Sequence, residues 1–293
     1  MEPAKKPAAP VRIACIQMDP KTFDKEGNWS TVLRMMEEAC ADGATFLVLP
    51  ELFNTGYPFE TREEAFSMAE PVPEGETTGR LIRFAAEKRA YVVGSIVEQE
   101  GLKLYNTSVF AGPDGYIGKY RKTHLCESEN FFFENGDLGF PVFHTRIGRV
   151  GMIICQDCFY PECFRILAMQ QADLVAIPTN WATQWRMKPK MLTMGPALCQ
   201  AAAISNYIFV AAANRIGKAG NYEYAGNSII SNPWGVPLGG PAGLSEEIVA
   251  ADCNLSETRE PYFNPYNARL DRRRIDLYDR MLGYKAPERK EEK

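Results

Sequence analysis

The residue with the clearest potential for covalent chemistry is Cys155. It follows the apolar run 151–154 and precedes a polar turn that contains Pro161, so we expect it at the carboxyl end of a buried strand. Open α/β sheets gather ligand-binding groups at that edge. A thiol at a strand-to-helix turn also lies near the positive end of the next helix, which predicts a lowered thiol pKa. The alternative is a buried structural thiol, which is the usual role of a free cysteine.

An acidic and a basic segment offer the partners that a nucleophilic thiol would need. Glu51 directly follows a predicted buried strand, where desolvation would raise its carboxyl pKa toward the range of a general base. A basic run contains Lys119, Arg121 and Lys122, and a cation there could stabilise an oxyanion. Spacing alone does not select one of the three. The alternative for Glu51 is a carboxylate in a solvated loop, and the alternative for the basic run is a solvated strand face.

Other chemistry for the cysteines fits less well. Cys155 and Cys158 have the spacing of a redox pair, but a redox domain of that kind is much shorter than 293 residues. A zinc site would need two further ligands, and only Cys163 is near in a chain with two histidines. A Cys–His pair would use His124 or His144, and His144 falls in a predicted strand. We therefore expect no metal and no organic cofactor.

The composition is ordinary for a globular enzyme or binding protein. Hydrophobic residues make up 45% and charged residues 24% of the 293 residues. The net charge of −4 and the lack of a basic cluster weigh against a nucleic-acid partner. Eight cysteines without a signal peptide, and without an apolar run of membrane-spanning length, predict free thiols in a cytoplasmic protein.

Strand and helix patterns alternate along most of the chain and predict α/β layers with a mixed sheet. Expected strands span residues 11–18, 45–49, 91–98, 105–112, 116–120, 142–145, 149–155, 174–178, 208–214, 228–231 and 248–252. Expected helices span residues 28–42, 60–68, 78–89, 164–171 and 190–205, with Asn28 or Ser30 as the first cap. Residues 1–10 are expected to be a disordered tail, residues 11–259 one domain, and residues 260–293 an extension with interface-type residues.

The acidic, basic and cysteine segments, in this order, resemble the motifs of the nitrilase superfamily of carbon–nitrogen hydrolases. Residues 50–57 (PELFNTGY) are similar to that family's glutamate segment, residues 120–125 (YRKTHL) to its lysine segment, and residues 151–162 (GMIICQDCFYPE) to its cysteine segment. Further similar segments, such as 178–181 (PTNW), extend the resemblance over residues 11–252. Several segments at compatible spacing make chance agreement a poor explanation.

The resemblance implies a role for each of these side chains. Cys155 would attack a carbonyl or nitrile carbon, and Glu51 would take and return the proton. Lys122 would stabilise the oxyanion, together with a backbone N–H near Gln156 in the substrate-binding site. Glu129 would orient Lys122 or position the substrate amide. The resemblance also implies an αββα four-layer-type sandwich, with mixed β-sheets covered by helices, that associates into a homodimer or a higher homo-oligomer.

Departures from the family pattern bear on the substrate. Hydrolases of N-carbamoyl-D-amino acids place arginines where this chain has Cys158 and Phe159, so a carboxylate clamp from that loop is missing. Asn180 and Trp181 are expected to line the pocket opposite Tyr57. We therefore expect a small amide or N-carbamoyl amine as the substrate. A small nitrile as substrate and a non-catalytic binding protein on the same fold are the alternatives.

Overall fold

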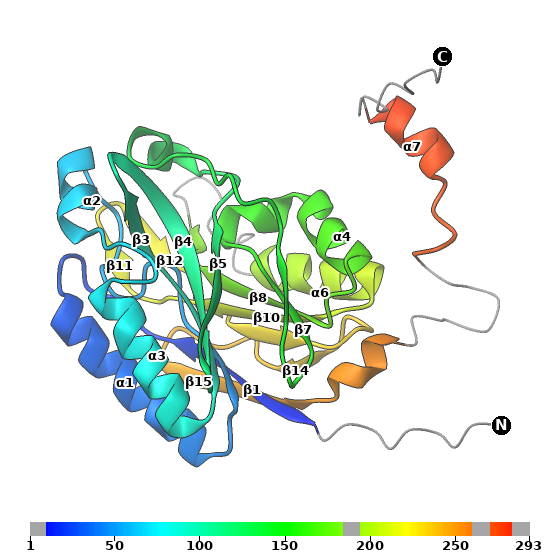
Figure 1. Ribbon diagram of the computed structural model, residues 1–293, viewed down its shortest axis with the longest axis horizontal. Coiled ribbons are helices and arrows are strands. Elements are labelled where there is room, and N and C mark those ends of the chain that lie inside the picture. The colour runs from blue at the N-terminus through cyan, green and yellow to red at the C-terminus, as the bar shows by residue number, and fades with distance from the viewer. Residues whose placement is uncertain (1–9, 184–193, 260–269, 283–293) are drawn as a thin grey trace.

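The protein forms two β-sheets packed face to face between helices, as the computed structural model shows (Figure 1). Residues 10–183, 194–259 and 270–282 are described, so residues 1–9 of the expected N-terminal tail and much of the C-terminal extension lie outside these ranges. Helices α1 (Lys25–Ala41) and α3 (Glu76–Lys88) cover one sheet. Helices α4 (Pro161–Met169) and α6 (Met194–Asn206) cover the other. The expected αββα sandwich is confirmed, and all four layers lie within one chain.

The first sheet has the strand order β15-β1-β2-β3-β4-β5. These strands are β15 (Glu247–Cys253), β1 (Val11–Gln17), β2 (Phe46–Val48), β3 (Tyr91–Glu100), β4 (Lys103–Gly112) and β5 (Gly115–Arg121). β1, β2 and β3 are parallel, whereas β15 and the hairpin strands β4 and β5 pair antiparallel with their neighbours. The sheet is therefore mixed, as the sequence predicts.

The second sheet has the order β14-β13-β10-β8-β7-β6 and the same plan. Its strands are β14 (Pro237–Gly239), β13 (Ile229–Ser231), β10 (Phe209–Asn214), β8 (Leu174–Thr179), β7 (Arg149–Met152) and β6 (Val142–His144). Its central strands β7, β8 and β10 are parallel, and the outer strands are antiparallel. Each sheet thus brings the carboxyl ends of three neighbouring strands to one edge.

Smaller elements complete the described chain. A third sheet contains β11 (Lys218–Ala219), β12 (Tyr222–Tyr224) and β9 (Ala182–Thr183). The remaining helices are α2 (Arg62–Met68), α7 (Ile275–Met281), and the 3-10 helices η1 (Glu127–Phe131), η2 (Cys155–Phe159) and η3 (Leu255–Arg259). No described helix combines the length and the apolar character that a bilayer-spanning segment needs.

The long apolar runs in the sequence arise because the first sheet is buried on both faces. Successive residues of a strand point to opposite sides. In β1, Ile13 and Cys15 pack into the core between the two sheets, whereas Ala14 and Ile16 pack with the core under α1 and α3. Both faces of the strand therefore need apolar side chains, and the alternation of polar and apolar residues disappears.

The start of the first helix differs from the prediction. α1 begins at Lys25, and its N-cap is Asp24, whose side chain accepts a hydrogen bond from the Gly27 N–H. The predicted caps, Asn28 and Ser30, are both inside the helix. Asn28 is buried, and its side chain bonds to neighbouring loops instead of the helix end. The first turn of α1 contains no buried apolar residue, so the apolar pattern predicted a helix start that is too late.

Candidate active site

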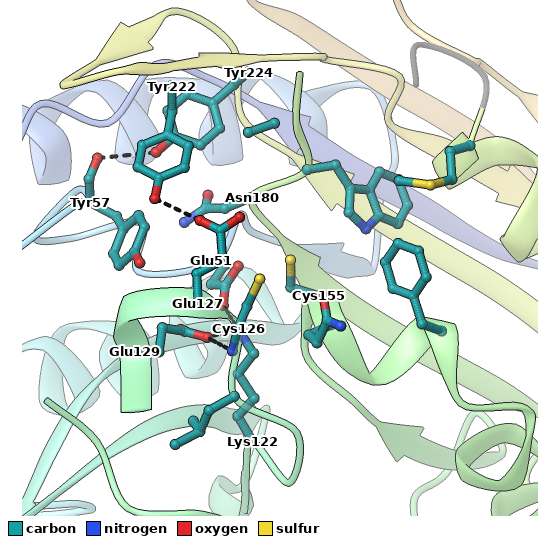
Figure 2. Close-up of a pocket in the computed structure, with 16 residues that line it drawn as sticks. Glu51, Tyr57, Lys122, Cys126, Glu127, Glu129, Cys155, Asn180, Tyr222 and Tyr224 are labelled. Carbon is teal, nitrogen blue, oxygen red and sulfur yellow. Dashed lines mark hydrogen bonds and ion pairs between the residues drawn. The ribbon is translucent and has the colours of Figure 1, made fainter. Parts of the chain in front are cut away.

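A cavity of about 440 Å³ opens where the carboxyl ends of strands from both sheets meet (Figure 2). All the site residues expected from the sequence line it: Glu51, Tyr57, Lys122, Glu129, Cys155, Gln156, Asn180 and Trp181. Glu51 follows β2 and Lys122 follows β5, both in the first sheet. Cys155 follows β7 and Asn180 follows β8, both in the second sheet. The two sheets therefore each contribute part of the site.

The ammonium of Lys122 lies between two carboxylates at the base of this cavity. Its Nζ is 2.7 Å from Oε1 of Glu51 and 2.6 Å from Oε2 of Glu129. All three side chains are almost fully buried. Burial lowers the pKa of Lys122, but the charges of Glu129 and Glu51 outweigh this effect and raise it well above its usual value. Lys122 is therefore a permanent cation at neutral pH.

Burial raises the pKa of Glu51 above its usual value, as expected from the sequence. The charge of Lys122 lowers this pKa and the charge of Glu129 raises it, so the carboxyl group is poised between two opposing neighbours. The nearby thiol of Cys155 also lowers the pKa of Glu51. A carboxyl group with a raised pKa beside a thiol can exchange a proton with it.

The expected lowering of the Cys155 thiol pKa is wrong. Burial raises this pKa well above its usual value, and the charge of Glu51 raises it further. The expected helix dipole is missing, because β7 ends at Met152, Cys155 lies in the short 3-10 helix η2, and α4 begins only at Pro161. The resting side chain is therefore a neutral thiol, which needs a base before it can attack.

Three segments around the cavity contain a residue with a left-handed backbone conformation. The φ angles are 49° at Leu52, 47° at Glu127 and 43° at Cys155. Side chains with a β-carbon rarely adopt this conformation, and such strain persists only where the surrounding fold enforces it. The strained residues adjoin or belong to the segments that supply Glu51, Glu129 and the thiol.

Asn106 is a buried member of the site that the sequence analysis missed. Its Nδ2 donates to Oε1 of Glu51 at 2.7 Å and to Oε1 of Glu129 at 3.1 Å. Its Oδ1 accepts a hydrogen bond from Ser95, whose hydroxyl in turn accepts one from the Leu52 N–H. The available signal was the polar run 106–108 in a strand that is buried after its first residue, Lys103.

Asp157 connects the cysteine segment to the lysine segment. It is fully buried, and its carboxylate accepts hydrogen bonds from the Ile154 N–H at 3.0 Å, the Tyr120 hydroxyl at 2.8 Å and the His124 N–H at 2.9 Å. Nδ1 of His124 is also 2.8 Å from this carboxylate. His124 thus faces Asp157, and His144 is exposed on β6, so neither histidine supports the alternative in which Cys155 pairs with a histidine.

We expect Asp157→Asn to reduce both stability and kcat. Asparagine replaces one carboxylate oxygen with an NH₂ group, which cannot accept the hydrogen bonds that this oxygen received. Each buried donor left without a partner lowers the free energy of unfolding by about 1–3 kcal/mol. Urea unfolding curves and kcat measured on the same preparation test this expectation. Asp114→Asn, on an exposed turn, is the matched control. Wild-type values for both quantities in Asp157→Asn would show that the carboxylate has no such role.

The thiols that neighbour Cys155 in the sequence lie in different surroundings. All eight cysteines are free thiols. Cys158 is 3% exposed and packs into the core, whereas Cys155 lines the cavity. Cys163 lies with His124 and Asp157, its Sγ being 3.8 Å from Nδ1 of His124. Hydrogen bonds of Asp157 and His124 account for this cluster.

The walls of the cavity contain polar atoms that have no partner among the described residues. Oδ1 of Asn180 and Nε1 of Trp181 are both buried and unpaired there. Buried polar groups are nearly always hydrogen-bonded, so Asn180 and Trp181, which both line the cavity, each leave one polar atom unsatisfied. Another part of the wall was not predicted from the sequence, because its two segments are far apart in the chain. Its residues are Cys126 and Glu127 at the start of η1, and Tyr222 and Tyr224 on β12.

Comparison with known proteins agrees with this geometry. Residues 12–261 match the family model described as carbon-nitrogen hydrolase. A nitrilase of Pyrococcus abyssi is 39% identical, over 92% of this chain and 100% of its own length. An omega-amidase of Homo sapiens is 35% identical, over 85% of this chain and 90% of its own.

A solved structure extends the comparison. It is a mutant of the amidase from Nesterenkonia sp. AN1 that shows Michael addition of acrylamide at the active-site cysteine. It is 25% identical with a TM-score of 0.76, and the match covers 93% of this chain and 100% of that one. With the αββα sandwich and a family-model match over most of its length, this chain belongs to the carbon–nitrogen hydrolase family.

Proposed function

We propose that the protein hydrolyses the carbon–nitrogen bond of a small amide or N-carbamoyl amine through a thioester on Cys155. The observation that carries this proposal is the buried ammonium of Lys122, held between Glu51 and Glu129 in the cavity that Cys155 lines. The reaction of acrylamide with the cysteine of the Nesterenkonia amidase supports a nucleophilic thiol in a relative.

The first half of the proposed reaction forms the thioester. Glu51 takes the proton of the Cys155 thiol as the sulfur attacks the carbonyl carbon. The charge that develops on the carbonyl oxygen is stabilised by Lys122 and by the backbone N–H of Gln156, which lies in the first turn of η2. Glu51 then returns the proton to the nitrogen, and ammonia or an amine leaves.

The second half releases the acid and restores the thiol. Glu51 takes a proton from water, and the resulting hydroxide attacks the thioester carbon. Lys122 stabilises the second tetrahedral intermediate in the same way as the first. The intermediate collapses with cleavage of the carbon–sulfur bond, and the leaving sulfur of Cys155 takes the proton from Glu51. The sequence of steps balances without a metal or an organic cofactor.

Asn180 lines the cavity, and a rotation of its side chain that turns the unpaired Oδ1 toward the substrate would favour an amide over a nitrile. An amide N–H can donate to this oxygen, whereas a nitrile has no hydrogen on nitrogen to offer. The relatives do not decide the question by name, since they include both a nitrilase and an omega-amidase.

The proposal is tested by measuring ammonia release from matched sets of small amides, N-carbamoyl amines and nitriles. We expect turnover of amides or carbamoyl compounds and little turnover of nitriles with the same carbon chain. Glu51→Gln should remain folded and lose turnover. Absence of turnover in all three sets would favour a non-catalytic binding protein, and turnover of the nitriles alone would favour a nitrilase.

The pH dependence of the reaction provides a second test. Glu51 acts as a base only when it is deprotonated, so its raised pKa places the acid limb of the kcat/KM profile above the pH at which an ordinary glutamate titrates. Glu129→Gln removes a negative charge that raises this pKa, so the acid limb should move to lower pH. Glu60→Gln, at an exposed position, is the control. An acid limb that stays in place or moves upward in Glu129→Gln would contradict the role of Glu51 as the base.

A further inference from the structure

The cavity contains a carboxylate that the proposed reaction does not use. Glu127 lines the cavity but is exposed, unlike the buried Glu51 and Glu129. Its Oε2 accepts a hydrogen bond of 2.8 Å from the Tyr222 hydroxyl, and no cation among the described residues forms an ion pair with it. Its left-handed φ of 47° fixes an unusual backbone conformation at this residue. Glu127 is therefore a negative charge held in the cavity wall and open to solvent.

Aromatic rings lie beside this carboxylate. Tyr222 bonds to Glu127, and its ring centroid is 6.2 Å from that of Tyr57 and 6.3 Å from that of Tyr224 (Figure 2). The faces of tyrosine rings attract cations. One carboxylate with several tyrosines is a combination that suits a positively charged group better than a neutral or negative one.

The charges of the described cavity lining also favour a positively charged group. Lys122 is the one cation in this lining, and its ammonium is already paired with Glu51 and Glu129. A carboxylate on the substrate would therefore find no unpaired cation among these residues, and it would be repelled by Glu127. A cation would meet an acidic wall without displacing an existing ion pair.

We propose that Glu127, Tyr222 and Tyr57 form a subsite for a positively charged group, such as a primary ammonium, at the end of the substrate remote from the scissile bond. This inference rests on the proposed amide hydrolysis and adds the substrate class. Because Glu127 is exposed, water and salt screen its attraction, so the subsite should change kcat/KM by about tenfold, mainly through KM.

The test uses three straight-chain primary amides of equal length whose far ends carry an ammonium, a methyl group or a carboxylate. Wild-type kcat/KM should be about ten times higher for the ammonium amide than for the methyl amide, and lowest for the carboxylate amide. Glu127→Gln should bring the first ratio close to one, and Glu127→Lys should reverse the order of the charged amides. High salt should weaken the wild-type preference. Glu134→Gln, an exposed position outside the cavity lining, should keep the wild-type order.

The outcomes separate this inference from the proposed function. Hydrolysis of the methyl amide without any preference for the ammonium amide would overturn the subsite and leave the hydrolase intact. A wild-type preference for the carboxylate amide, or an unchanged ratio in Glu127→Gln, would also overturn the subsite. If the folded wild-type enzyme hydrolysed none of the three amides, nor any N-carbamoyl amine, the proposed function itself would fail, and the subsite with it.

Discussion

Cys155→Ala is expected to abolish turnover, with a fall in kcat of about 10⁴-fold or more, while the protein remains folded. The sulfur is the proposed site of covalent bonding, and no neighbouring group can take its place in a thioester. Cys155 lines a cavity, so removing the sulfur enlarges an existing space and opens no new void in the core. The measurements are ammonia release and a thermal unfolding curve on the same sample.

A neighbouring thiol provides the control for this substitution. Cys158 lies in the same 3-10 helix but packs into the core, so Cys158→Ala should reduce stability and retain turnover. Intact-mass spectrometry adds a direct reading, because a slowly hydrolysed substrate should leave an acyl adduct on wild type and none on Cys155→Ala. Turnover that survives in Cys155→Ala would show that the sulfur is not the nucleophile.

The second large effect is expected from Lys122→Met. Removing the charge that stabilises the oxyanion should reduce kcat by about a hundred- to a thousand-fold. The same change leaves Glu51 and Glu129 buried without their cation, which should lower the free energy of unfolding by about 3–5 kcal/mol. Lys122 is thus expected to matter for both catalysis and folding, in contrast to Cys155.

The loss of stability in Lys122→Met should depend on pH in a defined direction. Lys122 lowers the pKa of Glu51, so its removal raises that pKa further above the value in the unfolded chain. A carboxyl group whose pKa is higher in the folded protein than in the unfolded chain stabilises the folded state at pH values below its pKa in the unfolded chain. This stabilisation is lost as the pH rises through its pKa in the folded protein. Urea unfolding should therefore show a smaller defect at pH about 5 than at pH about 8.

Lys119→Met is the matched control, because Lys119 pairs with Glu98, outside the cavity lining, and Arg121 also bonds to that carboxylate. This variant should keep wild-type turnover. A Lys122→Met enzyme with normal kcat, or with a defect that grows as the pH falls, would contradict the role of the ammonium.

Much of the layer architecture could be predicted because it follows from local patterns. Apolar runs such as that of β1 reflect burial on both faces of a strand, and this cause acts residue by residue. The choice of Glu51, Lys122 and Cys155 as reacting residues came from the family resemblance and not from their spacing. Because successive residues of a strand point to opposite faces, Lys119 and Arg121 share one face of β5, where both bond to Glu98, and Lys122 points the other way. This alternation does not reveal which of the two faces lies against the cavity.

The remaining features of the site depend on contacts between distant segments. Asn106 reaches Glu51 only because β4 and the end of β2 lie in the same sheet. Tyr222 reaches Glu127 from a small third sheet that left no clear pattern in the sequence. The thiol pKa of Cys155 was predicted in the wrong direction because it depends on where α4 begins and on how deeply the sulfur is buried.

The division of the site between two sheets has a consequence for engineering. Glu51 follows a strand of one sheet and Cys155 follows a strand of the other, so the distance between base and sulfur depends on how the two sheets pack together. A displacement of about 1 Å between reacting groups can slow an enzyme about a hundredfold. Repacking an inter-sheet side chain such as Ile13, remote in sequence from every reacting group, therefore offers a way to tune the rate without altering the cavity wall.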